Sequence, residues 1–401
     1  MYLEKVWSSN GKFDYKIAKN ELFSDSGFIS ELKKFCSSNG ISAEDAGAKC
    51  RGYFSSISGR YTYNKAFWSA MEYFVRTRII GDRNNLKYGK KNLMKLADLA
   101  KDNLLVILPN HKSVFDFMIL PYILATELSL FPAILAAEVF DIFPIGCIFR
   151  KTGSYFVRRE EKDPLYFIVF KHYIALLLKH HIANLFFIEG GRNKDGGYSE
   201  PKLGVLKYII YGKERSHIRE DILFVPVSIS YEFIPEHKIV VSEHMSQKRK
   251  HILKSLIKYL SFGEKFGNCY LHFGDPIKLS DFFSKSKGDS GMIQNLANKV
   301  MNEIKEHIVV TNTSLISYTI IKIGKEILPL DKLRMNIRNN YYLLRKSGRD
   351  VKNIDLKNIE RHLRLMESKN IITIKDDEIH VPKSSKSALE YYRKNILHFF
   401  E

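Results

Sequence analysis

The sequence predicts an α/β fold, in which a central mixed sheet is flanked by helices. Strand-like apolar runs alternate with helical patterns between about residues 104 and 277, which is typical of such a sheet. Helical spacing dominates before this stretch, and two amphipathic patterns followed by a hairpin pattern come after it. We therefore expect a helical N-terminal region at 1–100, an α/β domain at 101–310 and a small C-terminal module at 311–401.

The N-terminal region has the apolar periodicity of helices. Phe28, Leu32 and Phe35 recur at spacings of four and three residues, and the same pattern continues over Ala66–Ile80. No group of side chains in this region indicates chemistry.

The middle of the chain supplies the expected sheet. Its strand-like runs are Leu104–Leu108, Ser154–Val157, Leu185–Ile188, Ile222–Ser230 and Cys269–Phe273. Helical patterns at Pro164–His180 and His251–Leu260 lie between strands, so the sheet should be mainly parallel or mixed.

The C-terminal module begins with two amphipathic helical patterns. They are marked by Leu330, Leu333, Ile337, Tyr341 and Leu344, and then by Leu356, Ile359, Leu363 and Met366, with Gly348 between them. The runs IITIK and IHV around Asp376–Glu378 indicate a hairpin. Two helices followed by a hairpin predict a small winged-helix-like module.

Composition narrows the classes of partner. The 401 residues carry a formal net charge of +19 and include 27 Phe and 22 Tyr. A basic surface attracts phosphates, whether of nucleic acid, anionic lipid or a phosphorylated substrate. The four cysteines lack metal-ligand spacing and contain no CxxC, so we expect reduced thiols and no metal site.

The sequence also bears on membranes. No uninterrupted run of 18 or more apolar residues occurs, and no secretory signal is visible at the N-terminus. The nearest apolar stretch, Phe117–Phe140, is interrupted by Glu127 and Pro132. It either binds an apolar chain or the membrane interface, or forms a pair of core helices.

The stretch LLVILPNHKSVFD contains the first candidate for chemistry. His111 follows a buried strand in a polar turn, and Asp116 stands where a helical pattern begins. In that geometry Asp116 would hold one ring nitrogen and leave the other to take a proton from a hydroxyl. The alternative is a loop histidine beside an acid at a helix N-terminus.

Two further stretches carry charge at strand ends. SYFVRR places Arg158 and Arg159 after a strand, where a guanidinium can grip a phosphate or simply form a solvated basic turn. An apolar strand then runs into Glu189, Gly190, Gly191 and Arg192, with Lys202 following. The glycines allow close backbone approach to a ligand, although the spacing is neither that of a P-loop nor GxGxxG.

Together and in order, these stretches resemble the glycerol-3-phosphate acyltransferase family, of the bacterial membrane-associated type related to dihydroxyacetone-phosphate acyltransferases. The matching blocks are NHKSVFD, GSYFVRR, FIEGGRNKDGGYSEPKLG and VPVSISYE. The likeness covers about Leu104–Leu279. Asn193, Lys194 and Asp195 depart from the family's usual Ser-Arg-Thr, and Asp195 places an acid near the expected phosphate site.

The resemblance implies an acyltransferase-type domain and residue roles. His111 would be the general base and Asp116 would orient it. Arg158, Glu189, Gly190, Gly191, Arg192 and Lys202 would bind the acceptor. The acyl donor would be acyl-CoA or acyl carrier protein, with no other cofactor, and the protein would sit peripherally on the cytoplasmic face of an anionic membrane.

The implied reaction is acylation of the sn-1 hydroxyl of glycerol-3-phosphate to lysophosphatidic acid. The alternatives are dihydroxyacetone-phosphate or lysophosphatidic acid acyltransferase. Relatives that act on lysophospholipids usually have Pro and Thr where this chain has Ile188 and Gly191, which favours the smaller acceptors. A more distant alternative is a nucleic-acid-binding protein, which the charge suggests but the Glu-Gly-Gly-Arg loop does not, so we expect no nucleic-acid partner.

Overall fold

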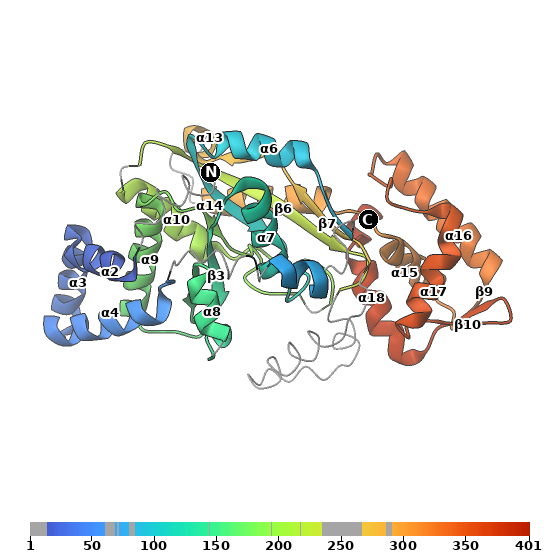
Figure 1. Ribbon diagram of the computed structural model, residues 1–401, viewed down its shortest axis with the longest axis horizontal. Coiled ribbons are helices and arrows are strands. Elements are labelled where there is room, and N and C mark those ends of the chain that lie inside the picture. The colour runs from blue at the N-terminus through green and yellow to red at the C-terminus, as the bar shows by residue number, and fades with distance from the viewer. Residues whose placement is uncertain are drawn as a thin grey trace.

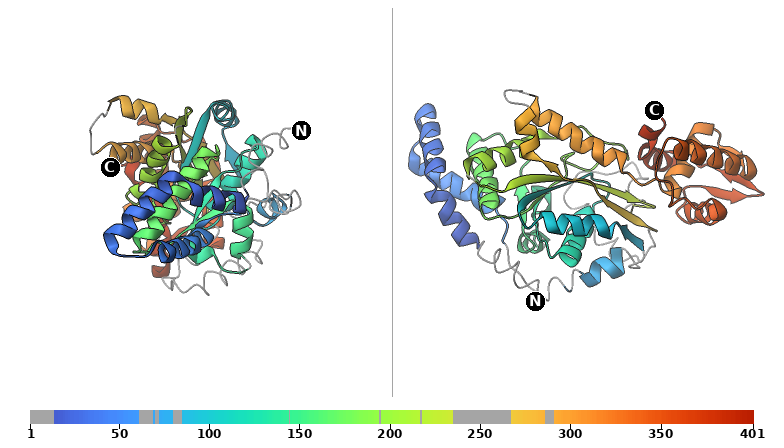
Figure 2. Two further views of the ribbon diagram at one scale, coloured as in Figure 1. Left: turned by 90° about the vertical axis from the view of Figure 1, so that its left-hand side faces the viewer. Right: turned by 90° about the horizontal axis from the view of Figure 1, so that it is seen from above.

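The structure is a computed structural model that describes residues 14–60, 69, 72–79, 85–143, 145–193, 195–216, 218–234, 267–285 and 291–401. The helix predicted at His251–Leu260 lies outside these residues, as does most of the pattern at Ala66–Ile80. Figures 1 and 2 show three parts in a row, with helices at one end, the sheet in the centre and the C-terminal module at the other end.

The described residues form one large central sheet. Its strands are β1 (Leu86–Tyr88), β2 (Asn103–Pro109), β3 (Ala133–Ala137), β4 (Ser154–Val157), β5 (Asn184–Leu185), β6 (Asp221–Tyr231), β7 (Cys269–Phe273) and β8 (Ile277–Lys278). The order is β1-β7-β6-β2-β5-β3-β4, with β8 also on β6. Strands β6, β2, β5, β3 and β4 run parallel, whereas β7 and β8 pair antiparallel with β6. The predicted mixed sheet is confirmed.

Both faces of this sheet are buried, which explains the continuous apolar runs of its central strands. Along β2, Leu105 and Ile107 enter one core, while Leu104, Val106 and Leu108 enter the other. Helices cover both faces (Figure 1). They are α6 (Lys90–Leu99), α7 (Asp116–Leu128), α8 (Ile145–Lys151), α9 (Pro164–Lys179), α10 (Leu203–Arg215), α13 (Leu279–Lys285) and α14 (Met292–Glu306).

Two features of the sheet differ from expectation. The stretch Phe117–Phe140 is not a pair of core helices, because α7 is followed by β3 and by the short 3-10 turn η3 (Glu138–Phe140). Strand β1 pairs with β7, so the sheet takes in residues from the region expected to be purely helical. The α/β part of the structure therefore begins before residue 101.

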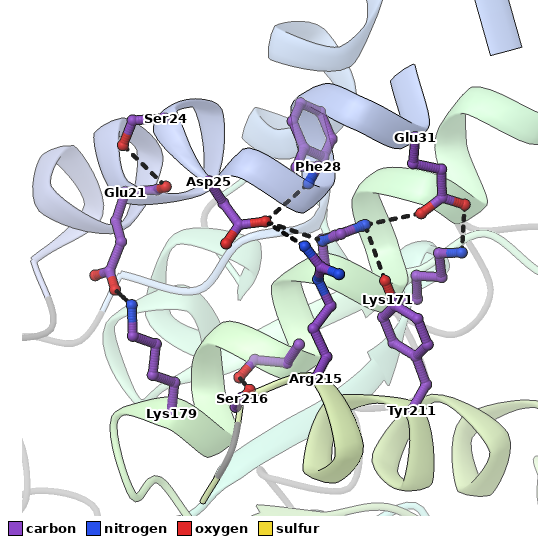
Figure 3. A network of polar contacts seen from close by, with 12 residues as sticks. Glu21, Ser24, Asp25, Phe28, Glu31, Lys171, Lys179, Tyr211, Arg215 and Ser216 are labelled. Carbon is purple, nitrogen blue, oxygen red and sulfur yellow. Dashed lines mark hydrogen bonds and ion pairs between the residues drawn. The ribbon is translucent and has the colours of Figure 1, made fainter. Parts of the chain in front are cut away.

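The N-terminal helices α2 (Tyr15–Ser24), α3 (Ser26–Asn39) and α4 (Ala43–Ile57) pack against α9. Figure 3 shows carboxylates of α2 and α3, and of the residue between them, meeting cations of α9 and α10. Glu21 pairs with Lys179 at 2.7 Å, Asp25 with Arg215 at 3.3 Å, and Glu31 with Lys171. Charge pairing thus joins the N-terminal helices to the outer layer of the α/β domain.

The C-terminal module contains the two predicted helices and the predicted hairpin. Its elements are α15 (Asn312–Ile323), β9 (Ile327–Pro329), α16 (Leu330–Lys346), η4 (Leu356–Asn358), α17 (Ile359–Ser368), β10 (Thr373–Lys375), β11 (Glu378–His380), η5 (Lys383–Ser385), α18 (Lys386–Lys394) and η6 (Leu397–Phe399). The strands form an antiparallel sheet in the order β10-β11-β9. Its winged-helix-like character stays a prediction. Helix α18 lies on the side of the module that faces the central sheet (Figure 1).

Within the described parts of the chain, no helix combines the length and the apolar character needed to cross a membrane.

Candidate active site

The candidate residues gather where parallel strands end. His111 follows β2, Glu189 follows β5, and Arg158 follows β4, while Tyr231 is the last residue of β6. The carboxyl ends of parallel strands share one edge of a sheet, and ligands of open α/β sheets bind at that edge. The fold therefore brings these residues, which are distant in sequence, to the same edge of the sheet.

His111 and Asp116 are in direct contact. The Nδ1 atom of His111 lies 2.9 Å from Oδ2 of Asp116. His111 stands in the turn after β2, and Asp116 is the first residue of α7, which is the geometry predicted from their spacing. Since an ionised carboxylate only accepts hydrogen bonds, His111 carries its proton on Nδ1, and Nε2 keeps its lone pair.

Asp116 is fully buried and receives four hydrogen bonds. Its Oδ2 also accepts from the backbone N–H groups of Lys112 at 2.7 Å and Ser113 at 2.8 Å. Its Oδ1 accepts from the hydroxyl of Tyr231 at 2.6 Å. These donors fix the Asp116 carboxylate, so it can both orient His111 and stabilise an imidazolium.

The imidazole of His111 is held from one side by an aromatic ring. It stacks on Phe187 with the ring centroids 3.9 Å apart and the planes 15° from parallel. The side chain remains 17% exposed, so the ring is both fixed and accessible.

Glu189 ties two loops together beside the histidine. Its side chain accepts from the backbone N–H of His111 at 3.1 Å and from that of Ser199 at 2.7 Å. Only 3% of Glu189 is exposed. The predicted acceptor-site glutamate therefore positions the histidine turn against the glycine-rich loop.

The glycines of this loop allow close approach. Gly190 has φ +70°, and a Cβ there would lie 2.6 Å from Cγ of Lys202. Lys202 is fixed in turn because its N–H donates to the carbonyl of Ile188 at 2.8 Å. Gly191 and Arg192 belong to this loop and Lys202 packs against Gly190, while Lys194 lies outside the described residues. The role of these residues in binding an acceptor stays a prediction.

The two adjacent arginines point to different partners. Arg158 pairs with Glu161 at 3.0 Å and with Glu138 at 3.5 Å. A Cβ placed on Gly191 would lie 3.3 Å from both terminal nitrogens of Arg159. Arg158 directly follows β4 and Arg159 stands in the next turn, so the two side chains have different neighbours.

Arg158 instead lines a small cleft of about 190 Å³ with Ser56, Glu138, Asp141, Phe156 and Tyr166. In this cleft Glu138 pairs with Arg158 and Asp141 pairs with Arg150, so the Arg158 guanidinium is already engaged by a carboxylate. The sequence selected Arg158 for the acceptor, whereas the structure places Arg159 next to the glycine-rich loop.

Three residues of the site were not selected from the sequence. Tyr231 was visible as the end of a buried strand, but nothing in the pattern tied its hydroxyl to Asp116. Lys112, next to His111, is 1% exposed, and burial lowers its pKa to about 8. Arg159 lies in the same basic turn as Arg158, but only Arg158 was assigned to the acceptor.

The central domain matches the acyltransferase class of protein. Residues 86–230 match the Acyltransferase family model, and this range includes His111, Asp116, Arg158, Glu189 and most of β6. Residues 246–401 match the model of the glycerol-3-phosphate acyltransferase C-terminal region. Both regions of the chain therefore resemble glycerol-3-phosphate acyltransferases.

Curated relatives named glycerol-3-phosphate acyltransferase agree with this. The protein of Pseudoalteromonas atlantica is 29% identical over 77% of this chain and 41% of its own length. That of Ectopseudomonas mendocina is 32% identical over 62% of this chain and 30% of its own length. That of Pseudomonas aeruginosa is 25% identical over 92% of this chain and 46% of its own length. The chain thus spans less than half the length of these relatives.

Among solved structures, the 1-acyl-sn-glycerophosphate acyltransferase of Thermotoga maritima is similar to 59% of this chain and 76% of its own. The identity is 17% and the TM-score 0.34.

Proposed function

We propose that this chain transfers a fatty acyl group from an acyl thioester to the sn-1 hydroxyl of glycerol-3-phosphate, giving lysophosphatidic acid. The observation that carries the proposal is the contact between His111 and the buried, fourfold hydrogen-bonded Asp116. This pair stands beside a Glu-Gly-Gly-Arg loop at the edge where α/β proteins bind ligands.

The chemistry follows from the tautomer. Nε2 of His111 takes the proton of the acceptor hydroxyl as its oxygen attacks the thioester carbonyl. The new C–O bond forms, the C–S bond breaks, and the imidazolium returns the proton to the leaving thiolate. The thiol belongs to coenzyme A or to acyl carrier protein, and this route needs no further cofactor.

The acceptor phosphate would be bound by cations around the glycine-rich loop. Arg159, Arg192 and Lys202 lie on or against this loop, whereas Arg158 is engaged by two carboxylates. We therefore assign the phosphate to Arg159 and Arg192 rather than to Arg158. Dihydroxyacetone phosphate offers the same phosphate and a hydroxyl at the same distance, so it remains the nearest alternative acceptor.

The acyl chain needs an apolar surface next to the base. Phe117, which follows Asp116, packs against Phe149 at 4.7 Å and Phe140 at 6.0 Å between ring centroids. Phe143, nearby in sequence, is 83% exposed. We propose that the acyl chain lies along this aromatic cluster.

We further propose that the protein binds the surface of an anionic membrane at its cytoplasmic face, through helix α16. Leu333, Ile337 and Leu344 are buried on one face of this helix. The opposite face exposes Met335, Tyr342 and Leu343, each more than half accessible. Its cations Lys332, Arg338, Arg345 and Lys346 flank these apolar side chains, which is the pattern of an interfacial helix.

The decisive experiment is an assay of thiol release from palmitoyl-CoA that depends on glycerol-3-phosphate. His111→Gln should lower kcat by about 10²–10⁴-fold, because the general base is lost. His380→Gln, on the far hairpin, is the matched control and should leave kcat unchanged. Normal turnover by His111→Gln would refute the proposed base.

The same assay separates the acceptors. Glycerol-3-phosphate, dihydroxyacetone phosphate and lysophosphatidic acid would be offered in turn and in competition. We expect the highest kcat/KM with glycerol-3-phosphate. A higher value with lysophosphatidic acid would replace the proposed acceptor with a lysophospholipid.

A further inference from the structure

The glycine-rich loop is held from behind by a buried lysine. Nζ of Lys112 donates to the carbonyls of Gly196 and Gly197, each at 2.7 Å. The same ammonium lies 3.9 Å from the centre of the Tyr198 ring. Because Lys112 follows His111 directly, its side chain connects the histidine turn to the far end of the loop.

The C-terminal helix α18 contacts the same lysine and the same loop. The hydroxyl of Tyr391 donates to the carbonyl of Lys112 at 2.8 Å. Lys394 pairs with Asp195 at 2.5 Å. Just beyond the helix, the carbonyl of Asn395 accepts from the hydroxyl of Tyr198 at 2.9 Å. Three contacts therefore join the last segment of the chain to the site.

The fit at Gly196 is too tight for any other residue. Its φ is +84°, and a Cβ would lie 1.9 Å from the carbonyl oxygen of Tyr391. A side chain at this position would have to displace either the loop or α18. Backbone of the loop and backbone of the helix are thus in direct contact.

The ion pair of Asp195 with Lys394 also changes the charge next to the proposed phosphate site. This acid lies in the glycine-rich loop, near the proposed phosphate site. Its carboxylate accepts from the N–H of Gly197 at 2.9 Å in addition to its pairing with Lys394. Burial alone would raise the pKa of Asp195, but these two partners hold it below its usual range. Lys394 thus neutralises an acid that would otherwise repel the acceptor.

We propose that α18 is a latch for the acceptor loop, with Lys394 and Lys112 as positioning residues for the bound phosphate. The latch holds residues 195–198 against the histidine turn and cancels the charge of Asp195. This inference rests on the proposed function for the identity of the acceptor, but not for the contacts themselves.

The test uses the full chain and a charge-matched set of variants. Lys394→Met leaves Asp195 uncompensated, so the KM for glycerol-3-phosphate should rise about tenfold, with the KM for palmitoyl-CoA nearly unchanged. Asp195→Asn combined with Lys394→Met removes both charges and should return the acceptor KM to within about twofold of the parent. Lys386→Met, an exposed lysine of the same helix, is the control and should change neither KM.

A second readout needs no substrate. Hydrogen exchange of the amides of residues 195–199 should speed up about tenfold in Lys394→Met and in Gly196→Ala, and not in Lys386→Met. Unchanged exchange and an unchanged acceptor KM would overturn the latch. A lower kcat, a change in both KM values and a lower unfolding midpoint in the same variant would also overturn it, since that pattern marks a purely structural role. If the parent lacks acyl transfer, faster exchange in these variants still supports the latch while the proposed acceptor fails.

Discussion

At the scale of single residues, Asp116 organises the site more than any other side chain. It is fully buried, and its four donors come from the histidine turn and from strand β6. The spacing of His111 and Asp116 made their contact predictable, because a residue in a turn can reach the first residue of the helix that follows five positions later. The contribution of Tyr231 was not predictable, since it depends on which strand lies beside β2.

Removing the Tyr231 hydroxyl tests whether catalysis depends on how the Asp116 carboxylate is oriented. Tyr231→Phe deletes the 2.6 Å hydrogen bond to Oδ1 and keeps the ring. We expect kcat to fall about tenfold with little change in either KM, since a hydrogen bond to a charged group is worth about 1.5–3 kcal/mol. Asp116→Asn should cost about 10²–10⁴-fold, because an amide can no longer fix the tautomer of His111.

Tyr270→Phe is the matched control for this pair, because Tyr270 is a buried tyrosine of the neighbouring strand β7. Its kcat should equal that of the parent. Equal losses in Tyr231→Phe and Tyr270→Phe would show that the effect comes from the sheet and not from Asp116.

At the scale of elements, apolar runs bounded by turn residues were predictable, and a strand within a continuous apolar stretch was not. The boundaries of β4 and β7 agree with the sequence patterns to the residue. Strand β3 was missed because it lies within a continuous apolar stretch, where neither the period of a helix nor that of a strand can be read. The choice between Arg158 and Arg159 also needed the structure, because adjacent residues differ only in the side to which they project.

The C-terminal turn η6 carries a histidine whose charge state should affect stability. Burial lowers the pKa of His398 to about 4, and Lys112, Lys305 and Arg349 act in the same direction. Its Nε2 donates to the carbonyl of Lys305 at 3.0 Å, while its buried Nδ1 has no hydrogen-bond partner among the described residues. The residue is therefore neutral in the folded protein at neutral pH.

The folded protein should therefore lose stability as the pH falls. As the pH falls below about 6.5, the unfolded chain takes up a proton that the folded chain refuses until about pH 4, so stability is lost over this range. Between about pH 7 and pH 5, the free energy of unfolding in urea should fall by about 2 kcal/mol less in His398→Gln than in the parent. Burial likewise lowers the pKa of His272 to about 4. Because His272 is present in both the parent and His398→Gln, its contribution cancels from the difference between them. Identical pH slopes would contradict a neutral, buried His398.

At the scale of the whole molecule, the two ends of the chain relate differently to the site. The N-terminal helices pack on the outer face of α9, and their charge network involves no residue of the site (Figure 3). The C-terminal module reaches the site through α18, which no local pattern could reveal, since Asp195 and Lys394 are far apart in sequence. The module also presents the exposed face of α16 away from these contacts.

Vesicle binding of the full chain tests whether that face meets a membrane. The parent should co-sediment with phosphatidylcholine vesicles only when these contain phosphatidylglycerol, and salt should weaken the binding. Arg338→Gln with Lys346→Gln should weaken binding about 10–30-fold, since each cation near an anionic surface is worth about 1 kcal/mol.

Tyr342→Ser with Leu343→Ser should weaken vesicle binding by a similar factor, because the apolar side chains no longer enter the interface. Met94→Ser, an exposed methionine of α6, is the control and should bind like the parent. Because all these side chains are exposed, the unfolding midpoint should not move, and thiol release in detergent micelles should be preserved. Vesicle binding that is unaffected by both α16 variants, or a dimer in solution that these variants disrupt, would show that the face serves another partner.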